Sequence, residues 1–258
     1  MALNHTLHAL MVGMSENWWR AGIMPCVRSD LERDKPVAYI FWLVDGPNGP
    51  VVVDTGYHPD YVAPEWAQGK DFIEPPALLK ELGVRAEEIQ TVVVTHFHQD
   101  HFTGLDYFPR AKFIIQRAEL EFWTGPLMRH EIFDKQIRPK VRPALKKLQQ
   151  EGRIQLIDGD FELYPGLDLL KAGGHTPGSQ MVALDTAAGK AVLCGDIAYT
   201  LSKSVPGRHL VAVDKRGRIV FQFSGCIFQH CCVSGIERHA APPRSKMFCS
   251  RRRAATSQ

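Results

Sequence analysis

Three histidines and an aspartate stand within six consecutive residues of this 258-residue chain, at His96, His98, Asp100 and His101. Imidazole nitrogens and carboxylate oxygens are the usual protein ligands of zinc and similar divalent metals. Alternate side chains of an extended segment share one side, so His96 and His98 can face the same ion. Asp100 and His101 follow past a bend, from which they can face a second ion about 3.5–4 Å away. The cluster is therefore predicted to be half of a two-metal site.

A histidine and an aspartate far away in the sequence are candidates for the remaining ligands. His175 lies in a turn rich in glycine and proline, the sequence GGHTPGS of residues 173–179. Asp196 follows the apolar segment that ends at Gly195. A single histidine or aspartate after a strand is more often structural than a ligand. The three segments together, in this order, favour a metal site.

The segments that carry these side chains are predicted to be short strands, joined by turns and helices. Apolar runs over residues 37–44 and 51–53, separated by a turn rich in glycine and proline, predict a hairpin. Residues 88–95 predict the buried strand that delivers the histidine cluster, and Gly104 after it allows close backbone approach. The alternation favours an α/β sandwich of sheets covered by helices. The other predicted elements are helices over 75–82, 118–123 and 135–150, and strands over 112–116, 154–157, 167–172, 181–185 and 191–194.

Composition is that of an ordinary globular enzyme, with 45% hydrophobic and 23% charged residues. No apolar run has the length that a membrane-spanning helix needs. Residues 1–17 contain no lysine or arginine and lack the basic start of a signal peptide. We therefore expect a cytoplasmic protein that has no membrane partner and no disulfide framework.

The motifs together resemble those of the metallo-β-lactamase superfamily. The similarity covers residues 35–200 and includes the strand end Asp54-Thr55-Gly56 as well as the three ligand segments. It implies an α/β fold, a four-layer αββα sandwich, with two divalent metal ions, zinc by preference, at one edge of the sheets. The resemblance implies that His96, His98 and His175 bind the first ion, that Asp100 and His101 bind the second, and that Asp196 bridges both.

Within the superfamily, residues 195–200 look like the N-acyl-homoserine lactonases, which have a tyrosine three residues after the bridging aspartate. Tyr199 stands at that position. The likeness implies that Tyr199 donates a hydrogen bond to the substrate carbonyl or the leaving oxygen, although a half-buried packing tyrosine is the alternative. It implies quorum quenching: a hydroxide between the metals opens the lactone ring, with Asp100 as a proton relay. The expected partner is a small lactone, and the expected state a monomer or homodimer.

The end of the chain departs from this family. No Gly-His-Asp turn follows to supply the last histidine ligand; His239 is at about the right distance, and His209 and His230 are less well placed. Residues 203–258 hold 11 of the 31 basic residues but 2 of the 28 acidic ones, and four of the six cysteines. We therefore divide the chain into a metallo-β-lactamase-like hydrolase domain at 1–202 and an atypical segment at 203–258.

Three explanations of that segment stay open. It is a basic extension that binds an anionic polymer or membrane surface, a divergent end that still provides a ligand, or the product of a reading frame that slipped near residues 201–205. The simultaneous change in charge, cysteine content and motif favours the slipped frame.

Other functions also stay open. A pyridoxine-type lactone hydrolase would use the same ligands and Tyr199, whereas a glyoxalase-II-like thioesterase would not need Tyr199. An inactive metal-binding protein would keep the first ligands and lose turnover through its altered end. A nuclease of this fold is disfavoured because residues 1–202 are acidic, so no nucleic-acid partner is expected.

Overall fold

The computed structural model describes residues 5–15, 37–62, 71–126, 141–187 and 189–197, and the backbone of residues 212–213 and 219–221. Tyr199, His209, His230 and His239 lie outside these residues, as does the start of the helix predicted over 135–150. No helix within the described ranges is long and apolar enough to cross a membrane.

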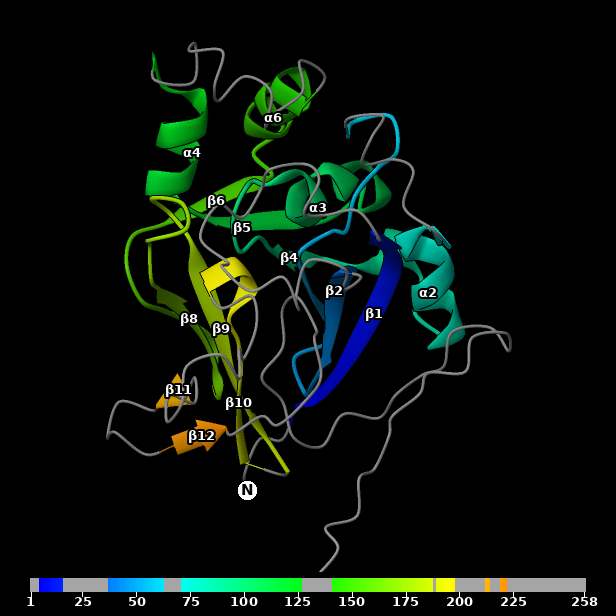
Figure 1. Ribbon diagram of the computed structural model, residues 1–258, viewed down its shortest axis with the longest axis vertical. Helices are drawn as coiled ribbons and strands as arrows, with labels where there is room; N and C mark the ends of the chain where they lie inside the picture. Colours follow the sequence, from blue (N-terminus) through cyan, green and yellow to red (C-terminus); the bar gives the residue numbers. More distant parts are fainter. Residues whose placement is uncertain are drawn as a thin grey trace, which may run out of the picture.

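Six strands form the first of two large sheets (Figure 1). In spatial order they are β1 (Thr6–Ser15), β2 (Val37–Asp45), β3 (Val51–Val53), β4 (Thr91–Val93), β5 (Lys112–Gln116) and β6 (Ile154–Ile157). Strands β1, β2 and β3 pair antiparallel, and β3 to β6 pair parallel. Parallel pairing brings the carboxyl ends of β3, β4 and β5 to one edge of the sheet, and the loops that follow them meet there.

Four antiparallel strands form the second sheet. Their spatial order is β10 (Gly189–Leu193), β9 (Gln180–Thr186), β8 (Leu167–Lys171) and β7 (Phe161–Tyr164). Two short strands near the end of the chain, β11 (Ala212–Val213) and β12 (Ile219–Phe221), pair with each other.

The helices are short and connect the strands. The α-helices are α2 (Pro75–Glu81), α3 (Gln99–Phe102), α4 (Arg117–Thr124) and α6 (Val141–Gln150). The 3-10 helices are η3 (Ala86–Glu88), η4 (Thr103–Tyr107) and η6 (Gly195–Ile197). Helix α2 ends as predicted, because Gly83 follows it with a φ of +74° that glycine tolerates.

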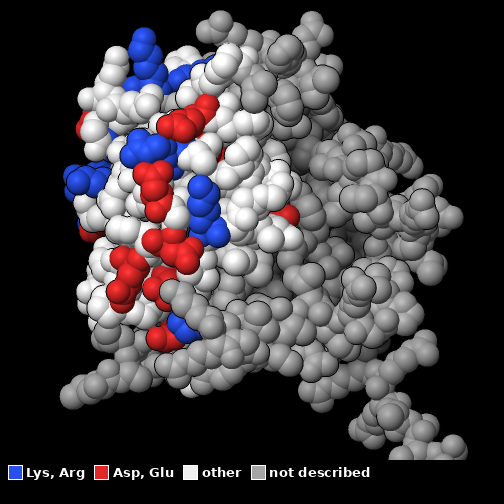
Figure 2. All heavy atoms as spheres, turned by 90° about the vertical axis from the view of Figure 1, so that its left-hand side faces the viewer, with Lys and Arg blue, Asp and Glu red and all other residues white. Residues whose placement is uncertain are grey.

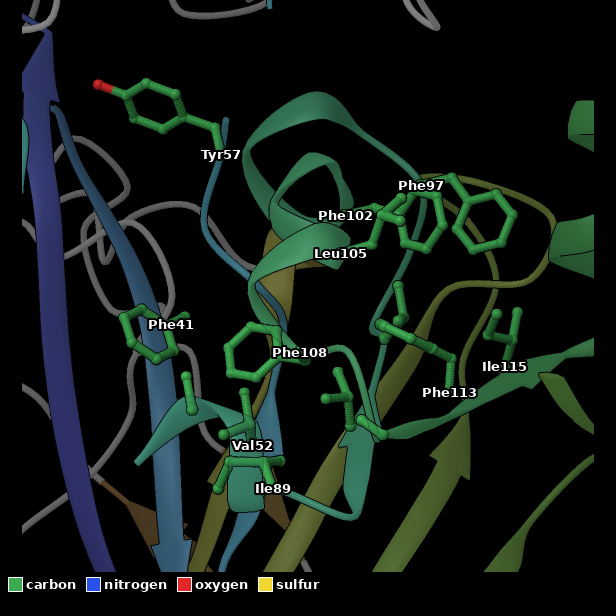
Figure 3. Close-up of a cluster of buried hydrophobic side chains, with 14 of the residues drawn as sticks. Phe41, Val52, Tyr57, Ile89, Phe97, Phe102, Leu105, Phe108, Phe113 and Ile115 are labelled. Atoms are coloured by element: carbon green, nitrogen blue, oxygen red, sulfur yellow. The ribbon is translucent and has the colours of Figure 1, made fainter. Parts of the chain in front are cut away.

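Strand β2 is buried on both faces, which explains its continuous apolar run. Tyr39 and Phe41 point into a cluster beneath the helices, whereas Ile40 and Trp42 point into a second cluster between the two sheets. Figure 3 shows the first cluster, in which aromatic side chains fill the space between the sheet and the helical segments. Helices α2, α4 and α6 all bury leucines in this first cluster. The described residues thus form a helical layer and two stacked sheets.

Most predicted elements are present, with differences at their ends. The predicted strand over 88–95 is shorter, because it pairs only along the three residues of β4, and η3 occupies its start. Helix α3 starts at Gln99, directly after His98, and Gly104 lies in η4, which follows it. Four strands were not predicted: β1, β7, β11 and β12.

Acidic and basic side chains are interleaved on the face of the molecule drawn in Figure 2. Ion pairs also occur between charged side chains of the described residues: Lys190 lies 3.0 Å from Asp185, and Arg117 lies 3.0 Å from Asp158. A nucleic-acid surface needs a contiguous basic stripe. The described residues of this face show a mixture of both signs instead.

Candidate metal centre

The first histidine loop leaves the carboxyl end of β4 and alternates its side chains. Phe97 is 1% exposed and stacks on Phe102 with ring centroids 4.3 Å apart, so it anchors the loop in the core. His96 and His98, on either side of it, turn the other way, and His96 Nε2 lies 3.0 Å from His98 Nδ1. The predicted alternation of this segment thus brings the two imidazoles together.

The next two candidate ligands lie in the first turn of α3. His98 precedes this helix in an extended conformation, and Asp100 and His101 are buried within it. The segment η4, which follows α3, packs closely on the chain just after β3, since a Cβ on Gly104 would lie 2.3 Å from the carbonyl oxygen of Thr55. Glycine is therefore required at this close approach.

His175 reaches the same place from the loop after β8. Gly173 and Gly174 both have positive φ, 64° and 85°, which glycine adopts without strain. The backbone N–H of Gly173 donates to the carbonyl oxygen of Ser179 and closes the turn at 2.9 Å. His175 Nε2 then lies 2.8 Å from His98 Nδ1.

Asp196 completes the group from the end of β10, after a tight bend at Gly195 with a φ of 51°. Its Oδ2 lies 3.7 Å from His96 Nε2 and 3.4 Å from His175 Nε2. Its Oδ1 lies 3.2 Å from His101 Nε2. The two carboxylate oxygens therefore face two different sets of imidazoles.

The separations fit a metal ion. Four ligand atoms at 2.0–2.1 Å from a tetrahedral zinc ion lie about 3.3–3.4 Å from one another. The ligand atoms of His96, His98, His175 and Asp196 all lie within 4.8 Å of one another, and the separations given above fall on both sides of the tetrahedral value. Small side-chain rotations would bring this group around one ion.

Burial keeps two of these imidazoles neutral. It lowers the pKa of His96 well below its usual range, and the nearby imidazoles of His101 and His98 lower it further. It also lowers the pKa of His98 to about 4, with the His175 imidazole as the next cause. Neutral imidazole is the form that binds metals, so the group is ready for a cation at neutral pH.

The surroundings of His101 shift its pKa in the opposite direction. Burial by itself lowers the pKa of His101, but the carboxylates of Asp100, Asp196 and Asp54 outweigh burial and hold this pKa well above its usual range. Asp100 Oδ2 lies 3.5 Å from His101 Nε2. A buried cluster of three carboxylates around one imidazole is an environment that favours positive charge, as a metal ion supplies.

Asp54 is a supporting residue that was predicted only to stand at a strand end. Its φ of 62° is unusual for a residue other than glycine. Its carboxylate accepts hydrogen bonds from the backbone N–H of Thr95 at 2.7 Å and from the Thr95 hydroxyl at 2.9 Å. His101 Nδ1 lies 2.7 Å from Asp54 Oδ2. Such carboxylate–histidine pairs fix the tautomer and orientation of a metal-binding imidazole.

The structure therefore brings together all six predicted metal ligands: His96, His98, Asp100, His101, His175 and Asp196. The predicted catalytic Tyr199 and the three candidates for a last histidine ligand cannot be compared in this way, because they lie outside the described residues.

Residues 38–216 match the model of a protein family described as the metallo-beta-lactamase superfamily. An N-acyl homoserine lactonase from Bacillus sp. is 30% identical in an alignment of length 172 that covers 62% of this chain and 63% of the relative. The chain thus spans less than two thirds of the length of this relative.

Solved structures agree in fold. A quorum-quenching N-acyl homoserine lactone lactonase matches with a TM-score of 0.57 at 23% identity, over 80% of each chain. AidC, a dizinc quorum-quenching lactonase in complex with a product, matches with a TM-score of 0.60 at 20% identity, over 80% of this chain and 76% of that one. These likenesses confirm the predicted sandwich fold.

Proposed function

The chain belongs to the metallo-beta-lactamase superfamily, and from this membership we propose that it is a metal-dependent hydrolase that opens the lactone ring of N-acyl-homoserine lactones. The observation that carries the proposal is the carboxylate of Asp196, whose two oxygens face separate imidazoles. The similarity to a Bacillus lactonase supports the choice of substrate.

The ligand assignment divides the site into two halves. His96, His98 and His175 would hold one ion, Asp100 and His101 the other, and Asp196 both. The imidazole-rich set suits zinc, and the dizinc relative supports two ions. When bound, such ions supply a water that ionises near neutral pH and a positive charge that polarises an ester carbonyl.

The protein residues orient the reaction. Water adds to the carbonyl carbon of the lactone, the ring carbon–oxygen bond breaks, and the leaving oxygen takes up a proton to give an N-acyl-homoserine. Asp100 is buried beside the metal-binding imidazoles, at a position from which its carboxylate can pass that proton. We assign to Tyr199 a hydrogen bond to the carbonyl or leaving oxygen, on the resemblance of residues 195–200 to lactonases.

A substrate panel on the purified full chain tests the proposal. We expect acid release from acyl-homoserine lactones, loss of this activity after treatment with a chelator, and recovery with Zn²⁺. If thioesters or other lactones are hydrolysed faster than acyl-homoserine lactones, the substrate assignment is wrong. Bound metal without any turnover would instead favour an inactive metal-binding protein.

The variant His98→Ala tests whether the histidines of the site are needed for metal binding and for ring opening. His98 is the shared neighbour of the other two imidazoles of its set, at 3.0 and 2.8 Å. The variant should bind less metal and should not open the lactone ring. Retained ring opening by the folded variant would contradict the assignment of the site.

A further inference from the structure

Helix α4 carries a buried carboxylate that the proposed chemistry does not use. Glu119 is 1% exposed and accepts four hydrogen bonds. A buried carboxylate is costly unless its oxygens are fully paired, so its presence in a core of aromatic and aliphatic side chains calls for a reason.

The two oxygens of Glu119 bind two different ligand loops. Oε1 accepts from the backbone N–H of Phe97 at 2.8 Å and from the indole of Trp123 at 2.7 Å. Oε2 accepts from the hydroxyl of Thr176 at 2.6 Å and from the backbone N–H of Gly178 at 2.9 Å. Phe97 stands between two candidate ligands in the sequence, and Thr176 follows a third.

The loop of His175 is packed directly on the backbone and Cβ of Glu119. A Cβ on Gly178 would lie 2.2 Å from the backbone nitrogen of Glu119 and 2.4 Å from its Cβ, so only glycine fits. On the other side, the ring of Trp123 meets the ring of His98 edge to face, with centroids 5.6 Å apart. Glu119 and its partners therefore touch both loops from one helix.

We propose that Glu119 is a positioning residue, which fixes the loop of His96 and His98 against the loop of His175 and so sets the separation of their imidazoles. The link between the loops is a property of the folded chain alone. Its consequence for metal binding rests on the proposed function.

Glu119→Gln tests the proposal with almost no change in size. All four partners donate, so the new amide NH₂ must face at least one N–H or O–H donor whichever way it turns. One loop then loses its anchor while the helix keeps its shape. Glu121→Gln is the matched control, because Glu121 is exposed on the same helix.

Two measurements follow these variants, both on the full chain. Amide hydrogen exchange at Phe97 and Gly178 should become about 5–10-fold faster at one or both positions in Glu119→Gln, as the loss of one buried hydrogen bond implies. Binding of Co²⁺, measured by competition with a chelator, should weaken about 10–100-fold, and the visible spectrum of the Co²⁺ form should change. Glu121→Gln should alter neither.

The outcomes separate this proposal from the proposed function. A folded Glu119→Gln with unchanged amide exchange and unchanged Co²⁺ affinity and spectrum would overturn the positioning role. If the unaltered chain binds no Co²⁺, the proposed function fails. Faster amide exchange in Glu119→Gln would still support Glu119 as the link between the loops in that case. Unchanged exchange would overturn that role as well.

Thr176→Val carries the test if Glu119→Gln does not fold. It removes one of the two donors to Oε2, together with the contact of the Thr176 hydroxyl with Ser179 Oγ at 2.7 Å, and keeps the side-chain shape. We expect faster exchange at Gly178, unchanged exchange at Phe97 and a several-fold loss of Co²⁺ affinity. Exchange and affinity both equal to those of the unaltered chain would overturn the proposal.

Discussion

Asp54 has a strained, left-handed backbone conformation, and its carboxylate contacts the residues around the candidate metal centre. A φ of 62° at a residue other than glycine costs about 1 kcal/mol. The interactions of the carboxylate with Thr95 and His101 offset that cost. They also hold the strand end and α3 together at the point where the ligands begin.

Asp54→Asn should weaken metal binding unequally at the two metal positions. Asparagine tolerates this backbone conformation, but its amide NH₂ faces either the backbone N–H of Thr95 or Nδ1 of His101. Where it faces His101, Nδ1 must accept, which puts the proton on the nitrogen that faces Asp196. We expect about 10–100-fold weaker binding at the position of His101 and a smaller effect at His96, His98 and His175. Zn²⁺ titration against a chelator measures both affinities, and equal losses would contradict the role of Asp54.

Tyr57 gives the protein a sensitivity to alkaline pH. Its side chain is 2% exposed, and its hydroxyl has no hydrogen-bond partner among the described residues. Burial, and then the charge of Asp100, raise the pKa of Tyr57 from 10.0 to about 12. Because the neutral phenol is favoured in the folded state, the stability from this residue is present below pH 10 and is lost as the pH rises towards 12.

Tyr57→Phe should remove that loss. The variant keeps the ring that packs on Phe72, at a centroid distance of 4.8 Å, and removes a hydroxyl that no described residue pairs with. We expect no loss of stability at pH 7 and a smaller decline between pH 10 and 12, measured by urea denaturation at each pH. An unchanged alkaline decline would show that other groups cause it.

At the scale of elements, Gln180 joins the two sheets beside the site. It is fully buried at the start of β9, and its amide donates to the carbonyl oxygen of Val94 at 2.7 Å. Its own carbonyl accepts from Gln116 Nε2 at 3.0 Å, and its backbone N–H donates to Thr95 at 3.0 Å. The strand after the His175 loop is thereby fixed to the strand before the histidine cluster.

Gln180→Leu should cost about 1–3 kcal/mol in free energy of unfolding, because the carbonyl of Val94 loses the hydrogen bond from the Gln180 amide. Gln155→Leu is the control, since Gln155 is exposed on β6 and its change should stay within about 0.5 kcal/mol. Chemical denaturation of both variants measures the difference. A Gln180 variant as stable as the control would mean that water or backbone movement replaces the lost bond.

Periodicity and turn residues predicted the elements that carry strong apolar runs, such as β2, β5 and α2, because these side chains are buried on regular faces. Strand β1 was missed because His8 and Gly13 interrupt its apolar residues, although Leu10 and Val12 are buried in the first cluster. Strand β4 was predicted too long, because Ile89 is buried without pairing in the sheet. Local sequence gives burial, whereas the extent of pairing depends on the neighbouring strand.

The candidate ligands were predictable for a different reason. Metal-binding side chains must have particular chemistry, and their spacing in the histidine cluster follows from the geometry of one short loop. The supporting residues Asp54 and Glu119 were not predictable, because a carboxylate carries no local sign of the distant backbone groups that it will bind. For example, Thr95 lies 41 residues after Asp54 in the sequence, and Thr176 lies 57 residues after Glu119.

At the scale of the whole molecule, the two halves of the candidate metal centre are unequal within the described residues. One half has three imidazoles and a carboxylate, and the other has one imidazole and the carboxylates of Asp100 and Asp196. The family match continues to residue 216, but the chain has no Gly-His-Asp turn after Asp196. The coding DNA tests the slipped frame: an alternative frame after residue 201 that restores this turn would support it.

We expect the full chain to bind two Zn²⁺ ions with different affinities, the weaker at Asp100 and His101, since each lost ligand weakens a site and three protein ligands still suffice for an open one. Stepwise titration with chelators of graded affinity measures both constants. Equal constants would mean that a ligand from the end of the chain completes the second half. His239→Gln, His209→Gln and His230→Gln would then identify it, because only the true ligand's variant should make the two constants unequal.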